Sequence, residues 1–132
     1  IRLLLSLEAP VVSLIHPTAV VSRHASLAVG TVVMANAVVN PFSRLGVACI
    51  VNTASTIDHD CELGDGVHIS PGAHIAGAVK IGDLSWVGIG ACIKQGHLIG
   101  RNVIIGSGAA VINDLPDNIV AVGVPAKVKE ES

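Results

Sequence analysis

The stretch VNTASTIDHDCELGDGVHISPGAHIAGAVKIG, residues 51–82, decides the fold because an aliphatic side chain returns at every sixth position. The spacing continues in both directions without an insertion, and all seventeen positions hold Val, Ile or Leu: Ile15, Val21, Leu27, Val33, Val39, Leu45, Val51, Ile57, Leu63, Ile69, Ile75, Ile81, Val87, Ile93, Ile99, Ile105 and Val111. An α-helix needs a spacing near 3.6, and a half-buried strand needs a spacing of two. A period of six instead predicts a short strand and a turn, repeated along the chain.

Two further columns follow the same period. Four residues after each aliphatic, twelve of the 17 positions hold Ala, Ser, Thr or Cys, which predicts an interior too narrow for two bulky side chains per hexad. Directly after each aliphatic, nine of the 17 positions hold Gly, Asn or Asp, the residues that best tolerate a left-handed backbone. We therefore predict that these residues form left-handed corners between the strands.

The hexads resemble those of the left-handed parallel β-helix, an all-β fold in which three hexads make one triangular coil. The handedness comes from the resemblance, because crossover connections are normally right-handed. The resemblance predicts about 5.7 coils, with residues 18 apart stacked on neighbouring coils that lie about 4.8 Å apart. We expect residues 15–116 to form the β-helix. Since both ends of a β-helix expose strand edges, residues 1–14 are expected to be an N-terminal remnant or cap, and residues 117–132 a C-terminal cap and tail.

Composition narrows the function of this chain, whose 132 residues are enough for one domain. The formal charge is −2 and there is no run of Lys or Arg, so nucleic-acid binding is not expected. The uncharged stretch 24–43 has the length of a membrane helix, but Gly30 and Pro41 interrupt it and the repeat explains it, so we expect no membrane segment. Three cysteines without CxxC spacing, and no signal peptide before them, favour a reduced, cytoplasmic protein.

One polar cluster within the repeat is a candidate for catalysis. His59 lies two positions after its aliphatic, between Asp58 and Asp60, where a side chain points outward from a corner. A carboxylate bound to one imidazole nitrogen orients the ring and makes the other nitrogen a better base. We interpret His59 as a general base oriented by Asp60, and Asp58 as a corner residue. The alternative is a solvated polar corner.

A metal site is the second possibility that the histidines raise. His68 and His74 end consecutive hexads, and left-handed β-helix trimers include the γ-class carbonic anhydrases, whose zinc is held by three histidines. That family uses a His-x4-His pair, but no two histidines here are five apart. Zinc-dependent hydration is therefore the minor alternative, and we assign no metal ligand.

The other histidines and the cysteines give structural predictions. His97 falls in the inward column, which predicts a buried and hydrogen-bonded ring. Cys49 and Cys61 lie in the same column and are expected in the core. Cys92 lies on an outer position without a histidine beside it in sequence, so nucleophilic cysteine catalysis is not expected.

Residues 11–127 together resemble the C-terminal domain of bacterial hexapeptide acyltransferases that acetylate sugars. The similarity is greatest to the sialic acid O-acetyltransferases and the N-acetyltransferases of nucleotide-linked amino sugars. It is carried by VVSLIHPTAVVS (11–22), the central stretch 51–82 and NDLPDNIVAVGVPAKV (113–128). The resemblance implies acetyl-CoA as cosubstrate, no metal, a sugar acceptor, and a homotrimer with sites between neighbouring prisms. Members carry an N-terminal α/β domain that holds the nucleotide, whereas about fourteen residues precede the first coil here. Either the chain is a fragment, or its acceptor is recognised differently.

The resemblance also assigns roles to residues. It implies that His59 is the general base, that Asp60 raises its basicity and that Asn52 positions the acceptor. It further implies contacts to acetyl-CoA from His68, Gly77, Ile89, Gly106, Ser107 and Lys127. In this comparison the Gly77 backbone N–H lies near the thioester oxygen, and Ile89, Gly106 and Ser107 line the groove. Lys127 meets a CoA phosphate or is simply solvated.

The leading hypothesis is an acetyl-CoA-dependent sugar N- or O-acetyltransferase that works by direct attack in a ternary complex. The alternatives are a zinc-dependent hydratase and a β-helical assembly module without activity. The sequence does not choose between amine and hydroxyl acceptors, because the same base serves both.

Overall fold

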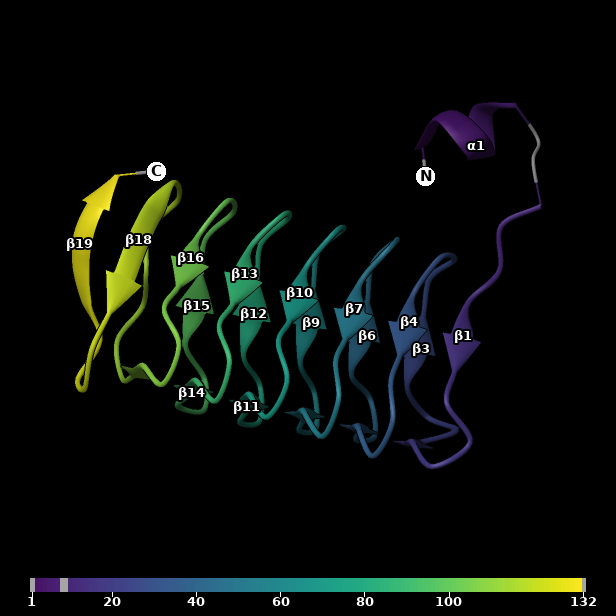
Figure 1. The fold of residues 1–132 in the computed structure, drawn as a ribbon, viewed down its shortest axis with the longest axis horizontal. Coiled ribbons are helices and arrows are strands. Elements are labelled where there is room, and N and C mark those ends of the chain that lie inside the picture. The colour runs from purple at the N-terminus through teal and green to yellow at the C-terminus, as the bar shows by residue number, and fades with distance from the viewer. Residues whose placement is uncertain (1, 8–9, 132) are drawn as a thin grey trace.

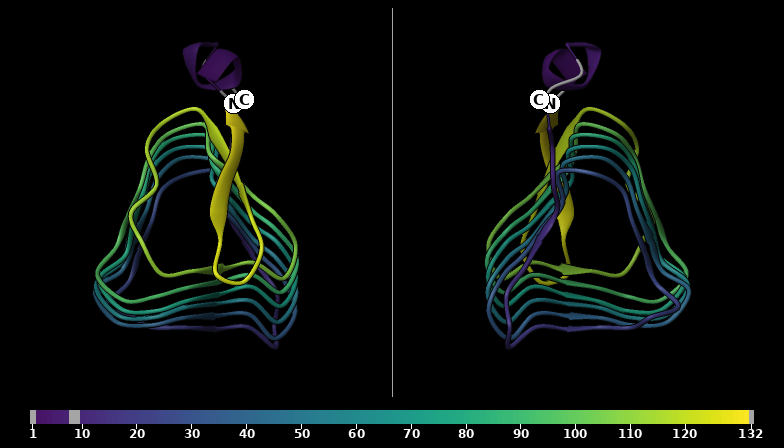
Figure 2. Two further views of the ribbon diagram at one scale, coloured as in Figure 1. Left: turned by 90° about the vertical axis from the view of Figure 1, so that its left-hand side faces the viewer. Right: turned by 90° about the vertical axis from the view of Figure 1, so that its right-hand side faces the viewer.

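A computed structural model describes residues 2–7 and 10–131. One short helix, α1 (Arg2–Ser6), precedes seventeen strands of two residues each, β1 to β17, which begin at intervals of six residues. The strands wrap into a triangular prism, seen from the side in Figure 1 and along its axis in Figure 2. The fold is the predicted left-handed β-helix, with about six coils.

Each side of the prism is one sheet. The A face is made of β1 (Leu14–Ile15), β4 (Val32–Val33), β7 (Ile50–Val51), β10 (His68–Ile69), β13 (Trp86–Val87), β16 (Ile104–Ile105), β18 (Ile119–Val122) and β19 (Lys127–Glu131). The B face is made of β2 (Val20–Val21), β5 (Val38–Val39), β8 (Thr56–Ile57), β11 (His74–Ile75), β14 (Cys92–Ile93) and β17 (Ala110–Val111). The C face is made of β3 (Ser26–Leu27), β6 (Arg44–Leu45), β9 (Glu62–Leu63), β12 (Lys80–Ile81) and β15 (Leu98–Ile99).

The register within each face confirms that residues one coil apart in sequence stack. His68 pairs with Trp86, for example, and His74 with Cys92, both in parallel. The chain passes from face A to B to C, so the prism has three edges, which we call the A/B, B/C and C/A corners. Residues six apart consequently lie on different faces.

The two inward columns form the core, as predicted. Every aliphatic of the period from Val33 to Val111 is buried, and so is every residue of the small column from Thr31 to Leu115 except His97. Cys49 and Cys61 are among them. Burial raises the pKa of the Cys49 thiol to about 11, so this thiol stays protonated at neutral pH.

The predicted position of the left-handed residue is wrong. Positive φ occurs three residues after each aliphatic, at every hexad from Gly30 to Gly108, and not directly after it. The glycines directly after an aliphatic have another cause, which is the close approach of the next coil. A Cβ added to Gly82 would lie 2.6 Å from the Arg101 nitrogen, and one added to Gly88 would lie 2.6 Å from the Ile105 oxygen. Space, and not backbone conformation, selects these glycines.

The two ends of the prism differ. At the C-terminal end β18 continues the A face and β19 pairs with it antiparallel, which buries Ile119, Ala121 and Ala126. At the N-terminal end Ile15 remains 49% exposed, and α1 lies beside the C/A corner (Figure 2). The division into residues 1–14, 15–116 and 117–132 stays a prediction. Among the described residues, no helix is long and apolar enough to span a membrane.

Aspartates close the C/A corner. The backbone N–H of Val47 donates to Asp65 Oδ1 at 2.8 Å, that of Asp65 to Asp83 Oδ1 at 2.8 Å, and that of Arg101 to Asp117 Oδ1 at 2.8 Å. Each carboxylate thus satisfies a backbone donor of the coil before it. This corner also holds a hollow of about 410 Å³ that Leu3 of α1 lines. Because its carboxylates are engaged by the backbone, we assign it a structural role.

Candidate active site

His59 projects from the B/C corner directly after β8. Its Nδ1 lies 2.9 Å from Asp60 Oδ2, and its side chain is 60% exposed. Its backbone N–H donates to Asp58 Oδ1 at 2.8 Å, so Asp58 holds the corner backbone while Asp60 contacts the ring. A carboxylate at Nδ1 favours the tautomer with its proton there, which leaves the Nε2 lone pair free to accept a proton.

Gly77 faces the other nitrogen of this ring. It occupies the same column as His59 on the next coil, and a Cβ at this position would lie 2.6 Å from His59 Nε2. The backbone N–H of Gly77 forms no hydrogen bond within residues 2–7 and 10–131. A hollow of about 310 Å³ opens here, with Gln95 and Gly96 on its far side. The arrangement combines a free imidazole nitrogen, a free N–H donor and space for a reacting group.

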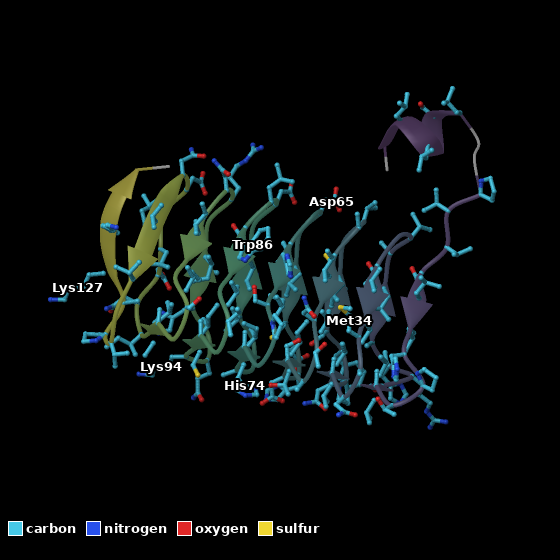
Figure 3. The ribbon with its side chains drawn as sticks, viewed as in Figure 1. Met34, Asp65, His74, Trp86, Lys94 and Lys127 are labelled. Carbon is cyan, nitrogen blue, oxygen red and sulfur yellow. The ribbon has the colours of Figure 1, made fainter. Side chains whose placement is uncertain are left out.

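Asn52 lies at a different corner from His59. It follows β7 at the A/B corner, where its Nδ2 lies 3.2 Å from His68 Nε2 and its Oδ1 accepts the Thr53 N–H at 2.8 Å. An amide Nδ2 can only donate, so in this contact His68 Nε2 is the acceptor. Burial lowers the pKa of His68, which also favours the neutral ring. The ring also packs on Trp86, with centroids 4.2 Å apart, on the A face (Figure 3 labels Trp86).

The other predicted acetyl-CoA residues continue along the A/B corner toward the C-terminus. Ile89 is 60% exposed, and Ser107 occupies the same column on the following coil. The backbone N–H groups of both form no hydrogen bond within the described chain. Lys127 stands opposite Val122, which packs against Gly106 at the end of this line. From His68 on β10 to Lys127 on β19 this line crosses four strand spacings, or about 19 Å.

The predicted site therefore falls into two groups at opposite edges of the B face. His59, Asp60 and Gly77 form the group at the B/C corner. The group along the A/B corner consists of Asn52, His68, Ile89, Gly106 and Ser107, with Lys127 beyond them. No hydrogen bond within the described residues joins the two groups.

Histidines that the sequence suggested as a metal pair do not meet. His68 lies on the A face and His74 on the B face, because one hexad amounts to one third of a coil. His74 Nδ1 instead lies 2.8 Å from Thr56 Oγ1 (Figure 3 shows His74). Within residues 2–7 and 10–131 there is no group of three or more His, Cys, Asp or Glu side chains placed to hold a metal ion.

Sequence reasoning missed two contacts. The tilted contact of Trp86 with His68 is signalled by their separation of one full coil in the sequence. The bond between His97 Nδ1 and Asp114 Oδ1, at 2.8 Å, had no such signal, because Asp114 lies where the period ends. His97 is hydrogen-bonded as predicted, but the predicted burial is wrong, because its side chain is 24% exposed.

Comparison with known proteins shows that the chain is similar over almost its whole length to β-helical acetyltransferases, which confirms the resemblance predicted from the sequence. No family model matches the chain. The acetyltransferase domain of PglB from Neisseria gonorrhoeae has a TM-score of 0.95 and 46% identity over 96% of this chain and 62% of its own, and it is also known in complex with acetyl coenzyme A. PerB from Caulobacter crescentus, in complex with CoA and GDP-perosamine, has a TM-score of 0.91 and 41% identity over 97% of this chain and 65% of its own.

A shorter match relates the chain to an O-acetyltransferase. The galactoside O-acetyltransferase of Lactococcus lactis is 52% identical over 33 residues, which are 25% of this chain and 16% of that protein. The chain thus spans less than two thirds of the length of each of these relatives.

Proposed function

We propose that this chain transfers an acetyl group from acetyl-CoA to an amine or hydroxyl of a nucleotide-linked sugar. The observation that carries the proposal is the His59 ring, held at Nδ1 by Asp60 and open at Nε2 toward Gly77 and its hollow. The known relatives support the chemistry, because PglB is known with acetyl coenzyme A, and PerB with CoA and GDP-perosamine.

His59 is the general base in this proposal. Its Nε2 accepts the proton of the acceptor amine or hydroxyl as that group attacks the acetyl carbon. Asp60 keeps the ring in the required tautomer and stabilises the imidazolium that forms. The free N–H of Gly77 donates to the carbonyl oxygen, where negative charge develops. Bound acetyl-CoA supplies the acetyl group as a thioester, with CoA thiolate as the leaving group.

The A/B corner fits the pantetheine arm of acetyl-CoA. Its unpaired N–H groups at Ile89 and Ser107 lie one coil apart and can donate to amide oxygens of the arm, while the Ile89 side chain offers an apolar contact. Lys127 stands at the end of this line, where a cation would meet a phosphate. At the C/A corner, by contrast, aspartates already occupy the equivalent donors of Val47 and Arg101.

We further propose that the active protein is a homotrimer, because the two halves of the site lie at different corners of one prism. Neighbouring prisms can set the A/B corner of one copy beside the B/C corner of the next. The outward side chains support this arrangement. On the A face Trp86 and Ile104 are 50% and 44% exposed, and on the C face, which exposes Leu98 at 51%, Glu62 is paired with Arg44 and Lys80.

The direct test is an assay of CoA release with acetyl-CoA and a panel of nucleotide-linked amino sugars, sialic acids and galactosides. We expect turnover with at least one acceptor, and loss of that turnover in His59→Ala. The acetylated product, identified by mass spectrometry, distinguishes an amine from a hydroxyl acceptor. No transfer to any member of the panel would contradict the proposal.

The trimer has its own test. Inactive His59→Ala and His68→Ala chains are mixed, unfolded and refolded together. If the site is shared between copies, mixed oligomers regain part of the activity, because some interfaces combine an intact A/B corner with an intact B/C corner. A site within one prism predicts no recovery.

A further inference from the structure

Phe42 is the unusual residue on the B/C corner. It is the single Phe of the chain, its side chain is 62% exposed, and its φ is +65°, in the left-handed region. A bulky side chain is disfavoured in this region, where glycine, Asn or Asp would serve the corner better. Of the fourteen left-handed positions from Gly30 to Gly108, one other, Leu84, holds a large apolar side chain.

The two residues differ in what surrounds them. Leu84 is exposed to the same extent, at 61%, but it lines the hollow beneath α1 together with Leu3. Phe42 lines none of the hollows described above; its ring stacks on His24, with centroids 5.4 Å apart and planes at 24°. Arg23 Nε lies 3.4 Å from His24 Nε2. An aromatic ring, an imidazole and a guanidinium therefore share one exposed surface.

This surface lies next to the proposed base on the side away from Gly77. Phe42 is one coil from Asp60, because the Asp60 N–H donates to Pro41 O at 3.1 Å and the Phe42 N–H donates to His24 O at 3.1 Å. Arg23 lies two coils before His59 in the same column. The hollow at Gly77, together with the predicted acetyl-CoA residues, lies toward the C-terminal end. An acceptor that reaches His59 from the N-terminal side, away from Gly77, would pass over Phe42.

The chemistry of this surface suits a sugar followed by a phosphate. The apolar C–H face of a sugar ring packs on an aromatic ring, and a guanidinium binds phosphate oxygens with directed hydrogen bonds. We propose that Phe42, backed by His24, is the platform for the ring of the acceptor sugar, and that Arg23 binds the phosphate linked to it. The inference rests on the proposed function and deepens it by locating the acceptor.

The substitution Phe42→Gly separates this role from a structural one, because glycine suits the left-handed corner better than phenylalanine. GDP-perosamine is the probe, or, if it is not acetylated, the fastest nucleotide amino sugar of the panel. We expect KM for the nucleotide sugar to rise about 10-fold, with KM for acetyl-CoA unchanged and Tm equal to or above that of the wild type. The matched control Leu84→Gly removes the other large side chain from a left-handed corner, and it should leave the acceptor KM within twofold.

Arg23→Gln tests the phosphate. KM should rise about 5- to 10-fold for the nucleotide-linked sugar and stay unchanged for the free amino sugar, which has no phosphate. An acceptor KM within twofold of the wild type in Phe42→Gly, while the wild type turns over, overturns the platform and leaves the proposed function intact. Dissociation of the oligomer in Phe42→Gly also overturns the platform, because it would show that this surface is a contact between copies. If the wild type acetylates no acceptor, the proposed function and the platform both fail.

Discussion

Two histidines on the B/C corner each bind an aspartate through Nδ1, but their surroundings differ. His59 Nδ1 lies 2.9 Å from Asp60, and His97 Nδ1 lies 2.8 Å from Asp114. Asp60 is the next residue in the chain, whereas Asp114 comes from the following coil. The His59 side chain is 60% exposed and the His97 side chain is 24% exposed.

The second carboxylate also holds the backbone. Asp114 Oδ1 accepts the Leu98 N–H at 2.9 Å, and this bond, followed by the bond to His97, lowers the pKa of Asp114. The His97–Asp114 pair thus ties the last coil to the chain that leaves it. Because both imidazoles carry a carboxylate, this bond does not distinguish the predicted base, His59, from His97. The surroundings of the other nitrogen decide, and His59 has a glycine and a hollow there.

The largest expected difference between the two pairs is in turnover. His59→Ala should lower kcat by about 10²- to 10⁴-fold, the usual contribution of a general base, with Tm unchanged because the side chain is exposed. His97→Ala, the matched control, should keep kcat within about twofold and lower Tm by a few degrees as a bond to the last coil is lost. Steady-state kinetics and thermal melts check both. A reversed result would assign the base to His97.

Gly77→Ala tests whether the space beside Nε2 matters. The added methyl would collide with the His59 ring, and the ring would have to turn away from the hollow. We expect kcat to fall roughly 10- to 100-fold, as for a misplaced catalytic group, with Tm within a few degrees of the wild type. Gly96→Ala is a poor control because Gly96 has positive φ, whereas Ala76→Gly enlarges the same hollow without touching the ring. Normal kcat in Gly77→Ala would show that the ring tolerates another position.

Asp60→Asn sharpens the comparison of the two carboxylates. Asparagine keeps the left-handed corner, where Asp60 has a φ of +57°, and removes the negative charge that stabilises the imidazolium. We expect kcat to fall about 10-fold with an unchanged melt. Asp114→Asn should leave kcat unchanged, since its carboxylate faces His97. Equal kinetic effects of the two substitutions would mean that the pairs do not differ in function.

The smallest effect concerns stability at acid pH. The pKa of Asp114 lies below its ordinary value of 3.8 in the folded protein, so its carboxylate stabilises the fold above that pH and this stabilisation is lost as the pH falls through the folded pKa. We expect Tm of Asp114→Asn to lie below that of the wild type at pH 6, and the gap to narrow as the pH falls below 3.8. Thermal melts of both proteins from pH 3 to 7 measure it. A gap that does not change with pH would exclude a contribution from the charge.

The sequence predicts the coils and the core well, because burial in this fold repeats with the same period as the residues that are buried. It predicts the corners less well. Glycine occurs at two positions of the hexad for different reasons: Gly90 has a positive φ, whereas Gly88 lacks space for a side chain. The residue types alone do not show which reason applies at which position.

The site is predictable in part, for a similar reason. The contact of His59 with Asp60 is local, so the motif predicts it. Asn52 and His59 are seven residues apart, which places them on different corners because one hexad turns the chain by one third of a coil. The motif alone does not show this separation. The bond between Asn52 and His68 depends on the rotamers of two side chains on neighbouring coils, which no periodicity specifies.

The coil-to-coil register restricts how this chain can change in length. Deleting one hexad between His68 and Ile89 would keep every aliphatic inside and every corner left-handed, so the protein would still fold. It would also turn everything that follows by one third of a coil, and Ile89, Gly106 and Ser107 would move to a different edge from His68. Only insertions or deletions of a whole coil preserve that line, lengthening or shortening it by about 4.8 Å. The fold should therefore tolerate steps of one hexad, whereas the proposed acetyl-CoA site should tolerate only steps of three.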